Sequence, residues 1–66
     1  MKVVVNGEER EVAAGTTVGE LVNVLELTSE RVAVERNGRI VQRAEHGRVV
    51  LSEGDRVEVV TLVGGG

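Results

Sequence analysis

The first thirteen positions contain two extended segments separated by a turn dipeptide. Lys2 to Val5 is mostly β-branched, Asn6-Gly7 is a dipeptide that accepts two positive-φ turn positions, and Glu8 to Val12 returns the chain. The pattern predicts a β-hairpin over residues 1–13. The acidic residues of the returning segment are typical of an edge strand that resists unwanted pairing.

The hydrophobic period changes from two to about 3.6 after residue 16. Thr17-Val18-Gly19-Glu20 has the spacing of a capping box, so we expect a helix to begin here. The apolar positions that follow an i, i+3, i+4, i+7 pattern are Val18, Leu21, Val22 and Leu25. Gly19 lowers the helix propensity, so packing of this single apolar face has to hold the helix.

The second half of the chain returns to extended patterns. Val32 to Arg36 predicts a strand, and the turn dipeptide Asn37-Gly38 leads into a short segment around Ile40 and Val41. We expect a loop at Glu45-His46-Gly47 with a solvated histidine, a short extended piece at 49–51, a turn at 52–55 and a last strand over 56–63.

This order of elements, hairpin, helix, strands and a long last strand, is typical of an α+β layout with one helix on a mixed sheet. If the last strand lies beside the first, the result is the ubiquitin-like β-grasp arrangement. We expect residues 1–63 to form the β-grasp domain and residues 64–66 to form a flexible glycine tail.

Composition limits what such a chain does. Its 66 residues suffice for one domain with a thin core, and the absence of Cys, Phe, Tyr and Trp leaves aliphatic packing to hold it. A net charge of −3, spread along the chain, disfavours nucleic-acid partners. With no stretch of membrane-spanning length and no secretory pattern, we expect a soluble cytoplasmic protein without membrane contact. The single histidine, His46, has no second metal ligand at useful spacing.

The last strand has two unlike faces. By alternation we assign Val57, Val59, Thr61 and Val63 to the core, and Arg56, Glu58, Val60 and Leu62 to the outside. The outer face thus changes from charged to apolar toward the tail. If Val4 sits beside it, Val4, Val60 and Leu62 form an exposed apolar patch that marks a docking site for a partner. The alternative is that these residues are covered or singly exposed.

The terminal Gly64-Gly65-Gly66 has no following helix, so it makes no phosphate cradle. Residues without Cβ thread narrow channels, and three residues at roughly 3.3–3.6 Å each extend about 10 Å beyond Val63. The glycines therefore predict a slender, extended tail. A cloning remnant or frayed end is the alternative interpretation.

Three segments carry a resemblance to a known family: Val32-Ala33-Val34-Glu35-Arg36-Asn37-Gly38-Arg39-Ile40-Val41, Glu53-Gly54-Asp55-Arg56-Val57-Glu58-Val59-Val60, and Val63-Gly64-Gly65-Gly66. Together they resemble the ThiS-type sulfur carriers of thiamin biosynthesis. The chain departs from that pattern at Gln42-Arg43-Ala44, where such carriers often show Pro-Arg-Ser.

The resemblance implies a non-enzymatic carrier that binds no cofactor of its own. An adenylating, ThiF-like enzyme would use ATP and magnesium to convert the Gly66 carboxylate into an acyl adenylate. A sulfur donor such as a cysteine desulfurase would then yield a thiocarboxylate, with Gly64 and Gly65 in the partner's active site. A ThiG-like thiazole synthase would take the sulfur, and the free carrier is expected to be a monomer.

Other functions remain open from the sequence. A carrier with the same tail could serve molybdopterin synthase as its small subunit, or serve tRNA thiolation. A protein modifier would form amides with lysines, and a β-grasp binding module would use no activation chemistry at all.

Overall fold

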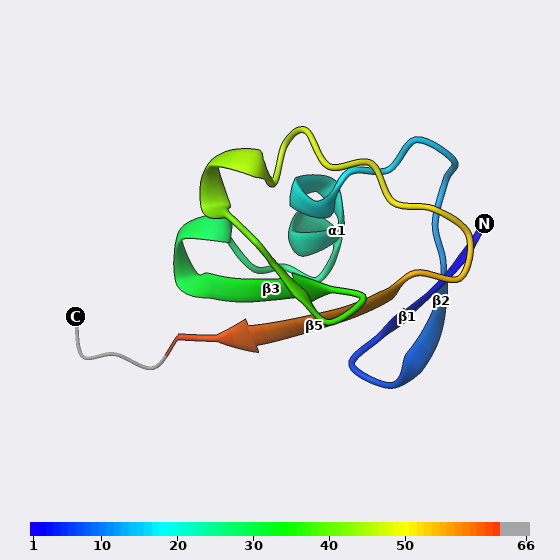
Figure 1. Ribbon diagram of the computed structural model, residues 1–66, viewed down its shortest axis with the longest axis horizontal. Helices are drawn as coiled ribbons and strands as arrows, with labels where there is room; N and C mark the ends of the chain where they lie inside the picture. Colours follow the sequence, from blue (N-terminus) through cyan, green and yellow to red (C-terminus); the bar gives the residue numbers. More distant parts are fainter. Residues whose placement is uncertain (63–66) are drawn as a thin grey trace.

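The computed structural model describes residues 1–62 and consists of two hairpins, one α-helix and a last strand that joins the hairpins (Figure 1). Its elements are β1 (Lys2–Val5), β2 (Glu8–Glu11), α1 (Val18–Val24), β3 (Val32–Arg36), β4 (Arg39–Val41) and β5 (Arg56–Thr61), with two short 3₁₀ turns at Ser29–Arg31 and Arg43–Glu45. The predicted last strand is confirmed as far as Thr61, and Val63 lies outside the described residues.

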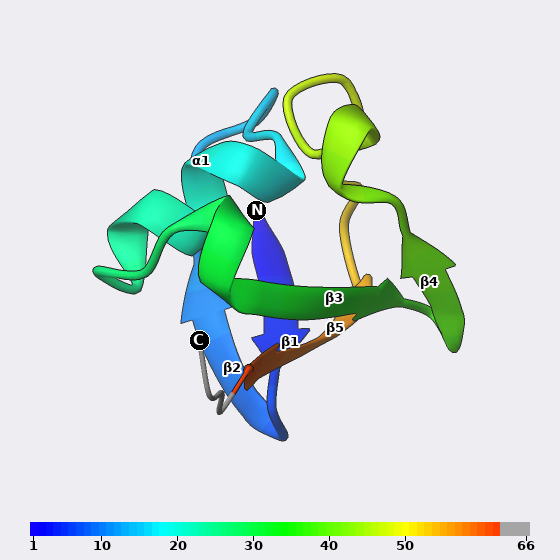
Figure 2. The same ribbon diagram turned by 90° about the vertical axis from the view of Figure 1, so that its left-hand side faces the viewer.

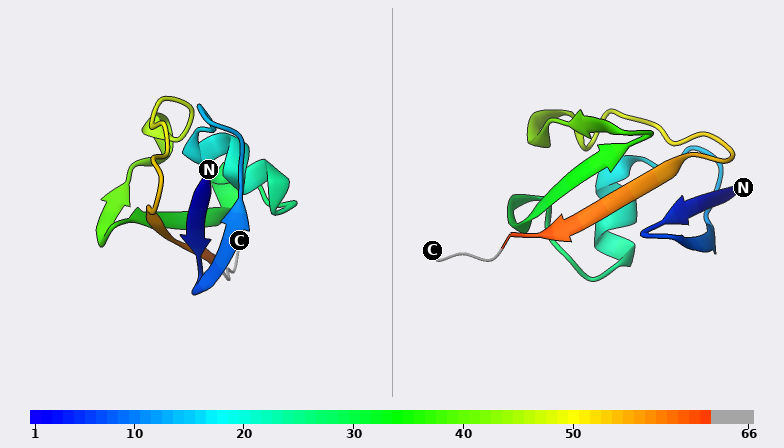
Figure 3. Two further views of the ribbon diagram at one scale, coloured as in Figure 1. Left: turned by 90° about the vertical axis from the view of Figure 1, so that its right-hand side faces the viewer. Right: turned by 60° about the horizontal axis from the view of Figure 1, so that its bottom comes forward.

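The sheet has the strand order β2-β1-β5-β3-β4. β5 is parallel to β1 and antiparallel to β3, so the last strand occupies the centre between the two hairpins. Figures 2 and 3 show α1 on one side of this sheet, while the opposite side carries no helix of the described chain. This arrangement confirms the predicted α+β class and the ubiquitin-like β-grasp fold.

Both predicted Asn-Gly turns are present. Asn6 and Gly7 have φ angles of 51° and 84°, and Asn37 and Gly38 have φ angles of 53° and 82°. Two successive positive φ values match the right-handed twist of the flanking strands, which is why this dipeptide sets the register of both hairpins.

The capping box at the start of α1 is also confirmed. The Glu20 amide donates to Thr17 Oγ1 at 3.1 Å, and the Thr17 amide donates to Glu20 Oε1 at 2.9 Å. The amide of Gly19 donates to the His46 carbonyl at 2.7 Å, and a Cβ at Gly19 would lie 3.3 Å from that oxygen. Glycine at this position therefore lets the loop around His46 pack directly against the first turn of the helix.

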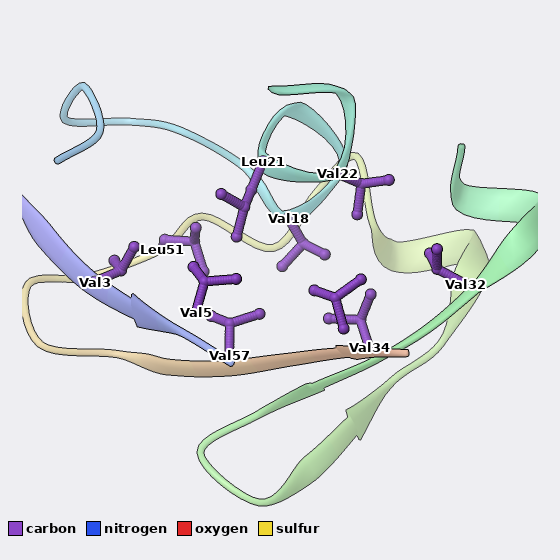
Figure 4. Close-up of a cluster of buried hydrophobic side chains, with 10 residues drawn as sticks. Val3, Val5, Val18, Leu21, Val22, Val32, Val34, Leu51 and Val57 are labelled. Carbon is purple, nitrogen blue, oxygen red and sulfur yellow. The ribbon is translucent and has the colours of Figure 1, made fainter. Parts of the chain in front are cut away.

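The core lies between α1 and the sheet and contains only valine and leucine (Figure 4). Its members are Val3, Val5, Val18, Leu21, Val22, Val32, Val34, Leu51, Val57 and Val59. Leu25, the fourth predicted helix position, packs against this cluster but is only partly buried. In the segment predicted to be extended at 49–51, Val50 forms one isolated bridge with Thr17, and Leu51 enters the core.

Two single-residue predictions are wrong. His46 is not solvated but 3% exposed, with Nδ1 2.8 Å from Ser29 Oγ and Nε2 3.2 Å from the Val41 carbonyl oxygen. These two partners, one seventeen residues away and the other five, satisfy both ring nitrogens and so permit burial of the ring. The polar residues next to His46 in the sequence give no sign of this burial. Thr61, assigned to the core, is exposed because it pairs with Val32 at the margin of the core.

Candidate partner-docking face

The two faces of β5 differ as predicted over most of the strand. Val57 and Val59 are buried under α1. Val60, on the opposite face of β5, is 60% exposed, and Leu62, directly after the strand, is 47% exposed. The exposed pair lies at the end of β5 from which the chain continues toward the glycines. The part of the strand nearest the tail is thus the part that offers apolar surface.

The predicted grouping of Val4 with this pair is wrong. The parallel register places Val4 beside Arg56 and Val5 beside Val57. Val60 lies four residues further along β5, which is about 13 Å at the usual rise of a strand. Val4 is also partly buried, so it does not extend the apolar surface near Leu62.

Ile40 takes the place that the sequence analysis gave to Val4. It is 71% exposed on β4, and with Val60 and Leu62 it lines an open hollow of about 550 Å³ on the outer side of β3. We call Ile40, Val60 and Leu62 the outer apolar patch. Ile40 was predicted in the short segment that follows the Asn37-Gly38 turn, and this turn places it opposite Glu35. Its position near β5 depends in addition on the pairing of β3 with β5, which the local pattern does not encode.

Two glutamates lie in the floor of the same hollow. Glu35 and Glu58 are direct partners in the β3–β5 register, and both side chains are exposed. Among residues 1–62 the ion pairs involve other groups: Arg36 Nε with Asp55 Oδ2 at 2.7 Å, and the amino terminus with Glu11 at 2.9 Å. The hollow therefore combines an apolar patch with an acidic pair.

The start of β5 is held by the buried carboxylate of Asp55. It accepts hydrogen bonds from Arg36 Nε at 2.7 Å, Asn37 Nδ2 at 3.0 Å and the Ser52 amide at 2.8 Å. Burial acts to raise the pKa of Asp55, but the bonds from Asn37, Ser52 and Arg36, together with the Arg36 charge, outweigh it and leave the pKa below its ordinary value. Asp55 therefore stays ionised and ties β5 to the β3–β4 turn.

The far part of β5 is held from both sides. The Val59 amide donates to Asn6 Oδ1 at 2.8 Å, and Asn6 Nδ2 donates to the Val59 carbonyl at 3.1 Å. On the other side the Leu62 amide donates to the Arg31 carbonyl at 2.8 Å. These bonds direct the strand up to Leu62, after which the predicted tail residues Gly64, Gly65 and Gly66 lie outside the described part of the chain.

Within residues 1–62 the side chains offer little else for chemistry. No cluster of three or more His, Cys, Asp or Glu residues there is placed to hold a metal ion. No helix in the same span is long and apolar enough to cross a membrane. What this region presents is an anchored strand end beside an apolar and acidic hollow.

Fold and site together define a ubiquitin-like β-grasp domain with an exposed apolar surface next to its last strand. The family model of ThiS matches residues 3–66, and the chain belongs to the ThiS family. A crystal structure of a thiamine biosynthesis protein (ThiS) from Geobacter metallireducens is 35% identical, with a TM-score of 0.84 and full coverage of both chains.

Two further relatives extend the comparison. The sulfur carrier protein ThiS of Escherichia coli (strain K12) is 29% identical over the full length of both proteins. A protein named thiazole synthase from Paramagnetospirillum magneticum is 46% identical over all 66 residues of this chain. The chain spans only about a fifth of that relative's length, so the likeness covers one region of a larger protein.

Proposed function

We propose that the protein is a sulfur carrier of thiamin biosynthesis, and that its reactive group is the carboxylate of Gly66. The observation that carries the proposal is the match to the ThiS family, which runs through Gly66. The anchored end of β5 supports it, because a fixed strand end presents the following residues in one direction. The thiamin relatives named above favour this pathway over molybdopterin synthesis or tRNA thiolation.

The chemistry that we propose needs activation of a poor electrophile. A Gly66 carboxylate oxygen attacks the α-phosphorus of ATP, and magnesium pyrophosphate leaves. A sulfur nucleophile then attacks the acyl carbon of the adenylate, and AMP leaves with the bonding electron pair. When the nucleophile is sulfide, the product is a thiocarboxylate. When it is a persulfide of the kind that a cysteine desulfurase carries, the first product is an acyl disulfide; a thiol reductant then attacks the donor's sulfur, forms a disulfide with it and releases the thiocarboxylate. Transfer of the sulfur to the acceptor returns an ordinary carboxylate. An adenylating enzyme of the ThiF type supplies the ATP site, so the carrier itself acts as a co-substrate and binds no cofactor.

In this proposal the domain stays outside the partner while the tail enters. Four residues follow Leu62, and in extended form they reach about 13–14 Å. Glycines at 64–66 avoid the Cβ clashes that a narrow channel would impose. The outer apolar patch lies where the tail begins, so the same partner surface can bind Val60 and Leu62 while its active site receives Gly66.

We propose a thiazole synthase of the ThiG type as the acceptor of the sulfur, and a cysteine desulfurase as one source of it. The larger relatives named thiazole synthase support the first assignment, because a region resembling this whole chain forms about a fifth of each. A carrier-like domain and a synthase joined in one protein would act in the same pathway.

Intact-mass measurement tests the proposal. The purified protein is incubated with the adenylating enzyme of its own organism, MgATP and a sulfur source. We expect a mass gain equal to the replacement of one oxygen by sulfur. The variant lacking Gly65 and Gly66 is the control: it should keep the circular dichroism of the wild type and gain no mass. Absence of a gain in the wild type would favour the binding-module alternative.

A further inference from the structure

The acidic pair in the outer hollow is unusual within its own sheet. Glu35 and Glu58 are directly opposite each other on β3 and β5, so their side chains emerge on the same face. Like charges at directly opposed positions destabilise a sheet. The register therefore places two like charges side by side on the face of the sheet that lies away from the core.

Within residues 1–62 neither glutamate forms an ion pair, although Arg56 lies two residues from Glu58 on the same face of β5. Arg43 lines the same hollow, yet neither it nor any other residue within 1–62 forms an ion pair with Glu35 or Glu58. Apolar side chains also line the hollow, among them Ile40, which is opposite Glu35 on β4, and Val60, which follows Glu58 on the same face of β5. An apolar rim lowers the local dielectric once a partner covers it, which strengthens any charge interaction in the middle.

We infer that Glu35 and Glu58 together form a receptor for one cationic side chain, an arginine or lysine, on the protein that docks against the outer apolar patch. A guanidinium is planar and carries several donors, so a single arginine can bond to both carboxylates and remove their mutual repulsion. This inference rests on the proposed function, since the partner is the enzyme that receives the tail.

Charge also argues against a second copy of this chain as the occupant. Two copies stacked on this face about a twofold axis through the hollow would bring Glu35 and Glu58 against the same two residues of the other copy. Juxtaposed like charges suppress such a complex. A surface with a basic residue amid apolar side chains is complementary to the hollow.

The test measures association of the intact protein with its adenylating enzyme by biolayer interferometry at low and high salt. The variant carries Glu35→Gln and Glu58→Gln, and the matched control carries Glu8→Gln and Glu9→Gln on the exposed edge strand β2, with the same change of net charge. We expect the first pair to weaken binding about tenfold at low salt and to flatten its salt dependence. The control pair should leave the affinity at low salt and its salt dependence nearly unchanged.

A second readout separates binding from folding. If the acidic pair is a receptor, its neutralisation should raise the melting temperature of the free carrier while weakening the complex. If the pair had a purely structural role, its neutralisation would change the melting temperature and the affinity in the same direction. Equal losses for the two double variants would show a net-charge effect and overturn the inference, as would wild-type affinity in the first variant.

The outcomes also distinguish this inference from the proposed function. If the wild type gains sulfur but the variant at 35 and 58 binds as tightly, only the receptor is wrong. If the wild type neither binds the enzyme nor gains sulfur, the carrier function fails and the receptor fails with it. Sedimentation velocity of the wild type alone completes the test, since a dimer that is altered by the substitutions at 35 and 58 would identify a second copy as the occupant.

Discussion

The two Asn-Gly turns have the same backbone but hold β5 in different ways. Asn37 accepts from the Arg56 amide at 2.9 Å and donates to the buried carboxylate of Asp55. Asn6 instead bonds to both backbone groups of Val59, in an uncharged and exposed setting. The Asn37 turn thus secures the start of the strand through an ionic network, whereas the Asn6 turn bonds to it at Val59 through one amide side chain.

The difference follows from how far each hairpin runs along β5. β3 pairs with β5 over five residues, whereas β1 pairs with it only at Val4–Arg56 and Val5–Val57. Beyond Val5 the Asn6 side chain takes the hydrogen-bonding positions that a longer β1 would occupy. The two turns thus hold β5 by different chemistry, through a charged network at Asn37 and through a neutral amide bridge at Asn6.

The largest effect should come from the substitution Asp55→Ala. It leaves Arg36, Asn37 and the Ser52 amide without their acceptor in a partly buried site. We expect the free energy of unfolding to fall by about 2–4 kcal/mol, measured by urea denaturation. Ser52→Ala is the control, because it keeps the backbone donor and should change stability by less than about 0.5 kcal/mol. A small loss for Asp55→Ala would mean that the network does not anchor the strand.

The substitution Asn37→Gly should have the second-largest effect. Glycine tolerates the φ of 53° at this position, so the loss reports the two side-chain bonds, one of which serves a buried charge, together with the greater freedom of glycine in the unfolded chain. The second contribution is shared by Asn6→Gly and leaves the comparison of the two turns intact. We expect a loss of about 1–3 kcal/mol in the same urea experiment. A loss smaller than that of Asn6→Gly would reverse the ranking of the two turns.

The substitution Asn6→Gly should cost less, about 0.5–1.5 kcal/mol, because its bonds are neutral. Its distinguishing result is local: hydrogen exchange at the Val59 amide should accelerate far more than exchange at Val34 on the neighbouring strand. Uniform acceleration across the sheet would show that Asn6 contributes to global stability alone.

The smallest effect concerns pH. The pKa of Asp55 is lowered in the folded protein, so its contribution to stability is present above its unfolded pKa of about 3.9 and is lost as pH falls through the lower, folded value. Urea titrations between about pH 5 and pH 2 should therefore show a steeper loss for the wild type than for Asp55→Asn. The pKa of Glu11 is lowered by its hydrogen bond from the amino terminus and by that group's charge, but this effect is common to both proteins. Parallel curves would contradict the prediction.

Local patterns predicted most of the fold because its turns and caps are encoded by neighbouring residues. The Asn-Gly dipeptides and the Thr17–Glu20 capping box act over two to three positions, and all three appear where expected. The β-branched alternation of the last strand likewise gave its two faces. Such features need no knowledge of distant parts of the chain.

The errors concern contacts between distant segments. Val4 was wrongly grouped with Val60 and Leu62 because its position along β5 depends on the register between the parallel strands β1 and β5. No local sequence pattern encodes this register. His46 was misjudged because Ser29 and Val41 satisfy its ring nitrogens across the fold. The exposed apolar surface beside the end of β5 was therefore predicted at Val60 and Leu62 but missed at Ile40. Its docking role and the roles of the glycines stay predictions.

The central position of β5 also bears on how the protein is made. Ribosomes synthesise this strand last, yet it separates the two hairpins and supplies the middle of the sheet. A nascent chain that stops short of it has two hairpins with no common partner, and such long-range pairing forms late in folding. A chain truncated before Arg56 therefore lacks the strand that both hairpins need, so a complete sheet requires translation at least through Thr61.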